Sequence, residues 1–173
     1  PVSRRKFMQA ATLAAAAPAV MEPLLGCGAQ GQTAGQNKPR FRAAVIGHTG
    51  RGDYGHGLDI VWLDVPGVQI VGVADANPQG LAAAVKRLGG VTGFDDYRKM
   101  LDQVKPELVS IGPRWLDQHR DMVVAAAERG VRGIYLEKPM CRSLAEADEM
   151  IAACEKNHVK LAIAHQTRYS PKL

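Results

Sequence analysis

The chain has 173 residues, 46% hydrophobic and 23% charged, a composition typical of globular proteins that bury a core. Its formal net charge is +5, but four of the excess positive charges lie in the first 40 residues, and no basic stripe with interleaved aromatic residues follows. The sequence therefore gives no indication of nucleic-acid binding. It also lacks the run of about 18 apolar residues that an ordinary membrane span needs.

Residues 1–27 are predicted to form a processed leader. The segment SRRKFMQ, Ser3 to Gln9, resembles a twin-arginine export signal, because an Ala-rich apolar stretch follows the two arginines. An ordinary Ala-rich helix is the alternative interpretation. Ala17-Pro18-Ala19 fits a cleavage site, whereas Leu24-Leu25-Gly26-Cys27 resembles a lipoprotein box that would place a lipid anchor on Cys27. Either route predicts an exported, periplasmic protein that uses the twin-arginine machinery.

Residues 28–40 are polar and rich in Gly and Gln, which predicts a disordered linker and a folded domain over 41–173. Of the three cysteines, Cys141 and Cys154 lie in that domain. The cysteines lack metal-site spacing, so no metal is predicted and these two are expected to be free thiols.

The folded part opens with the pattern of one βαβ unit. An apolar run over Ala43–Ile46 ends at Gly47, and a second run over Val68–Ala74 ends at Asp75. Between them, apolar residues from 58 to 65 recur at helical spacing. Strand, glycine turn, helix, strand and acid within roughly 30 residues are typical of a dinucleotide-binding unit.

The glycine turn departs from the usual G-x-G-x-x-G spacing. Gly47 and Gly52 fit the first and third positions, but Thr49 stands at the second, with Gly50 beside it. Glycines and a helix N-terminus could hold a diphosphate, although glycines alone can equally be a simple turn. Asp75 could accept both ribose hydroxyls and would repel a 2′-phosphate, which favours NAD over NADP.

The remaining chain alternates between helical and strand patterns. This alternation predicts an α/β fold with a doubly wound, mostly parallel sheet. We expect helices over 77–88, 95–101, 117–129 and 143–157, and strands over 91–94, 108–111, 134–136 and 160–164.

In such a sheet, ligands bind beyond the carboxyl ends of the strands. Residues expected at that edge are the glycine turn, Asp75, the loop 112–115, His119, Glu137-Lys138-Pro139 and the segment 165–169. A lysine there could stabilise developing alkoxide charge on a carbonyl or hydroxyl oxygen. A lone Lys138 could also be a solvated surface residue.

The order of these motifs resembles the glucose–fructose oxidoreductase/inositol dehydrogenase (Gfo/Idh/MocA) family. The resemblance covers residues 41–173 and rests on AVIGHTGRG, VADANP, FDDYRKML, SIGPRWLDQHRDMVVAAAERG, YLEKPMCRSLAEADEMI and HQTRYSP. It implies an NAD(P)-binding Rossmann domain of an enzyme that transfers hydride to or from a sugar or polyol.

The resemblance also implies a role for each matching residue. The residues that would hold the cofactor are Gly47, His48, Thr49, Gly50 and Gly52 at the diphosphate, Asp75 at the adenosine ribose, Pro113 and His119 on the nicotinamide side, and Glu137 and Lys138 at the nicotinamide ribose and reacting end. Lys138 would be the active-site lysine, and the Pro139 that follows is often cis in this family.

Members of this family continue into a second α/β domain that supplies most of the substrate pocket. The resemblance therefore implies that this chain is a fragment, inactive alone, whose catalytic acid/base lies elsewhere, and that the full-length protein is a homo-oligomer. Three functions stay open: an exported sugar or polyol oxidoreductase, an NAD-dependent glycoside hydrolase that works by oxidation and elimination, and a non-catalytic nucleotide-binding domain.

Overall fold

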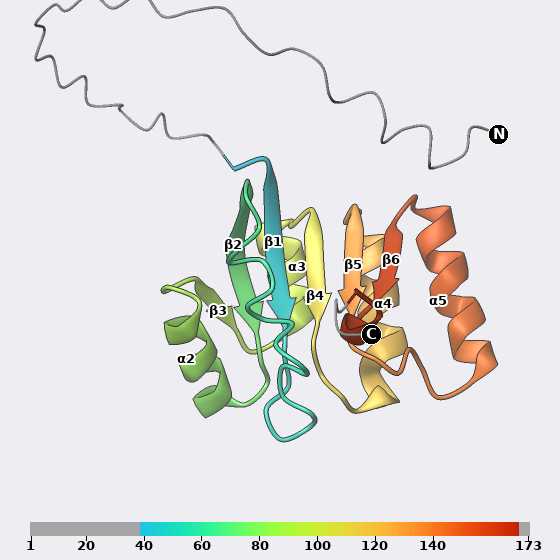
Figure 1. Cartoon of the computed structure of the whole chain (residues 1–173), viewed down its shortest axis with the longest axis horizontal. Coiled ribbons are helices and arrows are strands. Elements are labelled where there is room, and N and C mark those ends of the chain that lie inside the picture. Colours follow the sequence, from blue (N-terminus) through green and yellow to red (C-terminus); the bar gives the residue numbers. More distant parts are fainter. Residues whose placement is uncertain (1–38, 170–173) are drawn as a thin grey trace, which may run out of the picture. The chain divides into compact units, whose positions relative to one another are not determined.

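A computed structural model describes residues 39–169 of the chain (Figure 1), and the following description concerns these residues. The predicted leader, the Cys27 lipoprotein box and nearly all of the predicted linker lie outside them. Among the described residues, no helix has the length and apolar character needed to cross a membrane.

The centre of the fold is a six-stranded sheet in the order β3-β2-β1-β4-β5-β6, with every neighbouring pair parallel. The strands are β1 (Phe41–Ile46), β2 (Val68–Ala74), β3 (Thr92–Phe94), β4 (Leu108–Ile111), β5 (Gly133–Leu136) and β6 (Lys160–Ile163). From β1 the chain builds outward to β3, then crosses to β4 and builds the other way. This reversal creates a crevice at the carboxyl ends of β1 and β4.

Helices connect the strands after β2. They are α2 (Pro78–Arg87), α3 (Tyr97–Val104), α4 (His119–Glu128) and α5 (Leu144–Lys156), with short 3₁₀ turns η1 (Leu116–Gln118) and η2 (Gln166–Tyr169). Side-chain caps fix their starts: Asn77 accepts from Gly80 N at 2.9 Å, and Ser143 accepts from Glu146 N at 3.2 Å. The fold predicted from the sequence is therefore confirmed, with most helix boundaries shifted by one to three residues.

Two apolar clusters pack on opposite faces of the sheet. Alternation along β1 divides them, because Ala44 and Ile46 belong to one cluster and Val45 to the other. The larger cluster includes Met122 and Met150 from α4 and α5, and α3 and α4 lie behind the sheet in Figure 1. The smaller cluster lies under α2 and the segment that follows β1. Burial on both faces explains the nearly continuous apolar strands.

The helix expected over residues 58–65 is wrong, because residues 49–67 form a series of turns. Positive φ at Gly50, Gly52, Asp53, Gly55 and Gly57 prevents a right-handed helix from starting before residue 58. Beyond them the backbone hydrogen bonds mostly join residues three apart, as from Ile60 N to Gly57 O at 3.2 Å and from Leu63 N to Ile60 O at 3.0 Å. We call residues 47–67 the turn segment.

Tertiary contacts explain the helical spacing in the turn segment. Leu58 is buried, while Trp62 donates its Nε1–H to Ser110 Oγ on β4 at 2.7 Å and lies edge-on to Tyr135 of β5. Val65, expected on the same apolar side, is exposed. The apolar residues thus cover the sheet face without a helix.

Candidate cofactor and active site

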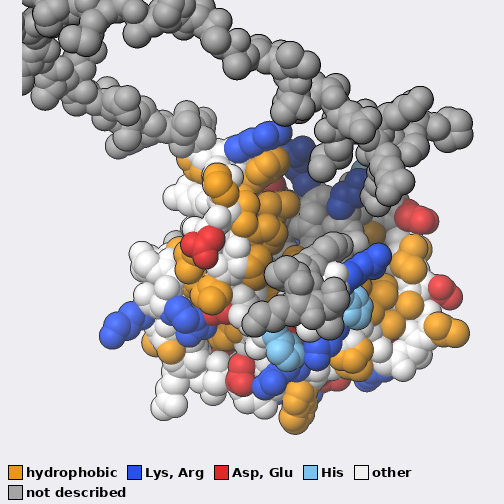
Figure 2. Space-filling model, viewed as in Figure 1, with side chains coloured by type: hydrophobic (Ala, Val, Ile, Leu, Met, Phe, Trp, Pro, Cys, Tyr) orange, Lys and Arg blue, Asp and Glu red, His pale blue; other side chains and the backbone are white. Residues whose placement is uncertain are grey.

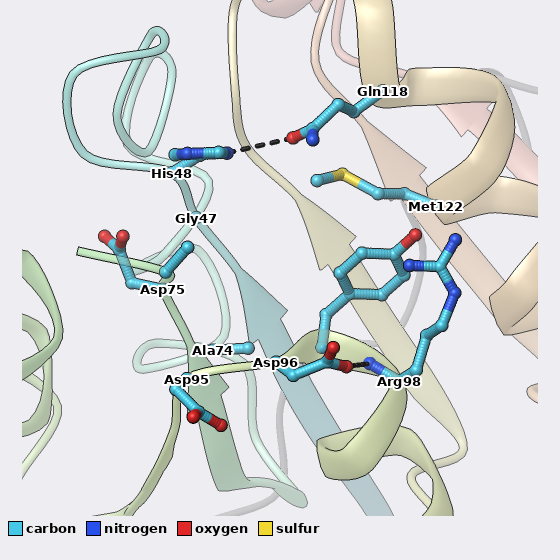
Figure 3. Close-up of a pocket in the computed structure, with 11 residues that line it drawn as sticks. Gly47, His48, Ala74, Asp75, Asp95, Asp96, Arg98, Gln118 and Met122 are labelled. Atoms are coloured by element: carbon cyan, nitrogen blue, oxygen red, sulfur yellow. Dashed lines mark hydrogen bonds between the residues drawn. The ribbon is translucent and has the colours of Figure 1, made fainter. Parts of the chain in front are cut away.

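The crevice at the carboxyl ends of β1, β2 and β4 contains a cavity of about 200 Å³. Its walls are Gly47, His48, Ala74, Asp75, Ala76, Asp95, Asp96, Tyr97, Arg98, Gln118 and Met122. His48 follows β1 and Gln118 precedes α4, and their side chains point toward each other across the crevice (Figure 3), with His48 Nδ1 2.9 Å from Gln118 Oε1. The cavity therefore lies where an open parallel sheet binds ligands.

Asp75 is hydrogen bonded to residues of the turn segment. Its residue is 1% exposed, and its carboxylate accepts from Thr49 N at 3.0 and 3.1 Å and from Thr49 Oγ1 at 2.6 Å. Tyr54 Oη donates to Oδ2 at 2.9 Å, and Asn77 N donates to Oδ1 at 2.9 Å. The sequence placed this carboxylate correctly at the end of β2 but did not predict these partners. In this conformation its oxygens are engaged by the protein.

Burial, followed by the charge and hydrogen bond of Asp75, raises the pKa of Tyr54 above its usual value. A raised pKa in the folded state stabilises the protein below the ordinary tyrosine pKa of about 10, and this contribution is lost as pH rises through the folded value. We expect the free energy of unfolding to fall above about pH 10, and Tyr54→Phe to reduce that fall. Urea titrations of the wild type and of Tyr54→Phe, each near pH 9 and near pH 11, would measure how far the free energy of unfolding falls in each protein. Burial also raises the pKa of Tyr97, so part of the decline should persist; an unchanged slope in Tyr54→Phe would contradict the assignment.

The glycine turn uses its own N–H groups. His48 N donates to Asp53 O, Gly50 N to Asp53 Oδ1, and Arg51 N and Asp53 N to His48 O, all within 3.0 Å. A diphosphate would have to take over some of these donors. Gly47 serves a packing role here, because a Cβ at that position would overlap the Tyr54 ring.

Glu137, at the end of β5, is fully buried. Its Oε1 accepts from Lys138 N at 3.0 Å, and its Oε2 accepts from His56 N at 2.8 Å and lies 3.0 Å from His56 Nδ1. Both oxygens of Glu137 thus have partners within the protein, and its contact with a nicotinamide ribose stays a prediction. The Lys138–Pro139 peptide is cis, and Lys138 itself is partly exposed.

His119 is also fully buried, at the start of α4. Its Nε2 lies 2.6 Å from Pro113 O, and its Nδ1 lies 3.1 Å from the carbonyl oxygens of Pro139 and Met140. His119 thus joins the loop after β4 to the loop that carries Lys138. Backbone carbonyls surround the ring in this structure, and the place of His119 on the nicotinamide side of a bound cofactor stays a prediction.

Other contacts hold the turn segment against the loop after β4. A Cβ at Gly52 would overlap the backbone of Arg114, Arg51 forms an ion pair with Asp117, and the Arg51 guanidinium lies 5.1 Å from the centre of the Trp115 ring. Figure 2 shows histidine and basic side chains gathered on the lower part of its visible face, toward the carboxyl ends of the strands. Three site residues were missed by the sequence analysis: Tyr54, His56 and Gln118. The spacing D-Y-G-H-G inside the turn was the available signal for the first two.

These residues fit the adenosine end of a dinucleotide. The cavity lies at the position that Rossmann-type sheets use for the adenosine ribose, and its wall includes the exposed carboxylate of Asp95, which could accept a hydroxyl proton; Asp75 could do so once the turn segment releases it. The fold and this cavity define a dinucleotide-binding α/β domain.

Comparison with known proteins agrees with that class. The model of the family described as "Oxidoreductase family, NAD-binding Rossmann fold" matches residues 41–165. The chain belongs to this family, Gfo/Idh/MocA. It is 33% identical over 134 residues to D-apiose dehydrogenase of Paraburkholderia graminis, covering 78% of this chain and 34% of the relative. It is 28% identical over 136 residues to glycosyl hydrolase family 109 protein 1 of Bacteroides fragilis, covering 73% and 29%.

Among solved structures, myo-inositol 2-dehydrogenase from Lactobacillus plantarum superposes with a TM-score of 0.65 at 26% identity. The match covers 76% of this chain and 38% of that protein. The chain thus spans about a third of the length of the curated relatives that it matches.

Proposed function

We propose that the chain is the NAD-binding part of an oxidoreductase that acts on a sugar or polyol. The observation that carries the proposal is Lys138, a partly exposed lysine whose backbone N–H is fixed by Glu137 at the carboxyl end of β5, in a chain of an NAD-binding oxidoreductase family. Similarity to a D-apiose dehydrogenase and a myo-inositol 2-dehydrogenase supports the substrate class.

When bound, NAD would supply the hydride acceptor or donor. The adenosine end would lie in the cavity beside Asp75, with the diphosphate near the turn at Gly47–Gly50 once that turn exchanges hydrogen bonds. The negative charge of Asp75 disfavours a 2′-phosphate, which supports NAD over NADP. The Lys138 ammonium would donate to the oxygen of the reacting carbon and stabilise its developing negative charge.

The test is calorimetric titration with NAD and NADP, followed by assays with D-apiose and myo-inositol on the longest natural form of the protein. We expect NAD to bind more tightly than NADP. We expect Lys138→Met to lower kcat about 100-fold, because a positioned proton donor contributes at least that much, while the Kd for NAD changes less than about twofold.

Lys156→Met is the matched control, since Lys156 is exposed in the last turn of α5 and should leave kcat unchanged. Binding of neither nucleotide by the folded chain would contradict the proposal and favour a non-catalytic domain. Equal activity of Lys138→Met and Lys156→Met would remove Lys138 from the mechanism.

A second candidate is an NAD-dependent glycoside hydrolase, which the similarity to a glycosyl hydrolase family 109 protein supports. Such an enzyme oxidises and later reduces its substrate, so it would release sugar without net NADH. Release of p-nitrophenol from any of a panel of p-nitrophenyl glycosides, with no rise in absorbance from NADH, would favour this function over the first.

We also propose that the protein is exported through the twin-arginine machinery, with residues 1–27 as the leader. The support is the SRRKFMQ segment and the apolar stretch that follows it. Lipidation at Cys27 is the alternative to simple cleavage.

A further inference from the structure

Thr49 stands at the second glycine position of the turn after β1, and its side chain lies against the acid at the end of β2. Thr49 Oγ1 donates to Asp75 Oδ2 at 2.6 Å, the shortest of the hydrogen bonds that this carboxylate accepts. The first turn of α2 leaves room for the side chain, because a Cβ at Gly80 would overlap Thr49 Oγ1. The fold therefore seats the Thr49 hydroxyl on the carboxylate that is proposed to bind the adenosine ribose.

The donors that the structure describes fill the carboxylate of Asp75. An ionised carboxylate accepts about four hydrogen bonds. Four groups already donate to this one: the N–H and the hydroxyl of Thr49, the Tyr54 hydroxyl and Asn77 N. Asp75 is also 1% exposed, so its surroundings leave little space for an additional partner. A ribose hydroxyl can therefore bind Asp75 only by replacing one of these donors.

Of these four donors, the Thr49 hydroxyl can leave at the least cost. Asn77 N belongs to the backbone that caps α2, and Tyr54 is buried with its ring in the smaller apolar cluster. The backbone of Thr49 is held in place, because the preceding residue, His48, donates its N–H to Asp53 O at 3.0 Å. The Thr49 side chain is partly exposed, so its hydroxyl can leave by a rotation about χ1. It is also an alcohol, like the ribose hydroxyl that would replace it.

We propose that Thr49 is an affinity-determining residue of the cofactor site, whose hydroxyl occupies the acceptor on Asp75 that the adenosine ribose needs. The inference rests on the proposed function. Binding exchanges one alcohol for another: the hydrogen bond from Thr49 Oγ1 breaks, and a ribose hydroxyl donates to the same carboxylate oxygen. A Cβ at this position also keeps the backbone away from the diphosphate, an approach that the second glycine of a G-x-G-x-x-G turn permits. Both effects make the wild type bind NAD less tightly than the same site without this side chain.

The first test compares Kd values for NAD, measured by calorimetry on the longest natural form of the protein. Thr49→Ala and Thr49→Ser both lose the methyl group, and they differ only in the hydroxyl. We expect Thr49→Ala to bind NAD about fivefold more tightly than the wild type, because a hydrogen bond to a charged acceptor no longer has to be broken. The conservative Thr49→Ser keeps the hydroxyl and should therefore keep the weaker binding. Thr49→Gly should tighten binding at least as much as Thr49→Ala, since it also opens the approach to the diphosphate.

The second test removes the competing hydroxyls from the ligand instead of the protein. ADP and 2′,3′-dideoxy-ADP each displace NAD in a competition titration, which gives their Kd values. We expect Thr49→Ala to bind ADP about fivefold more tightly than Thr49→Ser does, and the two variants to bind 2′,3′-dideoxy-ADP equally, within about twofold. The gain would then depend on the ribose hydroxyls. A merely structural effect of residue 49 would change the affinity for both ligands alike.

The outcomes separate this inference from the proposed function. Lack of NAD binding by the wild type and by all three variants would contradict the proposed function and the inference with it. NAD binding that Thr49→Ala leaves unchanged or weakens, or an equal gain for 2′,3′-dideoxy-ADP, would overturn the role of Thr49 and leave the proposed function intact. Thr92→Ala is the matched control and should keep the wild-type Kd, since Thr92 is exposed at the start of β3, away from the carboxyl ends.

Discussion

Replacement of Gly55 by alanine is expected to lower the free energy of unfolding by about 3 kcal/mol. The cost has two parts, because positive φ penalises any Cβ by about 1 kcal/mol and the added methyl must also displace neighbours that cannot move freely, at about 1–3 kcal/mol. Those neighbours are the buried carboxylate of Glu137 and the backbone carbonyl of Gly112.

Gly57→Ala is the matched control for this prediction. Gly57 lies two residues further along with φ +83°, but the nearest atom to its added Cβ would be Ile60 Cγ1 at an ordinary 3.7 Å. We expect a loss of about 1 kcal/mol there. Urea unfolding of both variants measures the difference. Equal losses would show that the backbone at Gly55 is not packed closely against Glu137 and Gly112.

Asp75→Ala is expected to lower the free energy of unfolding by about 4 kcal/mol, at least as much as Gly55→Ala. The substitution removes the acceptor of four donors, the N–H and hydroxyl of Thr49, the Tyr54 hydroxyl and Asn77 N, and leaves them in a site that is 1% exposed. We also expect NAD binding by the chain to be lost, because both the carboxylate and the shape of the turn disappear.

Two variants calibrate the Asp75 result. Asp75→Asn keeps one acceptor oxygen, and both hydroxyls can rotate to accept from its amide, so we expect a loss of only about 1–2 kcal/mol. Asp95→Ala removes a carboxylate from the same cavity, but that side chain is 76% exposed and should change stability by less than about 0.5 kcal/mol. Similar losses for Asp75→Ala and Asp95→Ala in denaturant titrations would contradict the hydrogen-bonded cluster.

The sequence was sufficient for the sheet because local patterns determine it. Strands β2 and β4 begin and end at the predicted residues, since each is an apolar run bounded by turn residues. Asn77 and Ser143, the first residues of two predicted helices, cap α2 and α5. The carboxyl-end location of Asp75, Glu137 and Lys138 followed from the same alternation.

The sequence did not predict the features of the structure that depend on contacts between residues far apart in the chain. Leu58 and Trp62 have helical spacing, yet residues 58–65 form turns that still bring these side chains to the sheet, Trp62 through its bond to Ser110. Spacing also gave no measure of burial, so the complete burial of Glu137 and His119 was not predicted. Their partners, His56 and Pro113, belong to other loops, and only the folded chain shows the contacts.

The helix-free turn segment also has a consequence for motion. Backbone hydrogen bonds join its two ends, Gly47 and Gly67, to the strands, and between them side chains hold it to the sheet, through Asp75, Ser110 and Glu137. Such a segment can detach as a unit while the strands stay paired, and its amides should exchange with deuterium long before those of β1 and β4. The donors now closed within the turn would become available during that local opening, so a dinucleotide could enter without the domain unfolding.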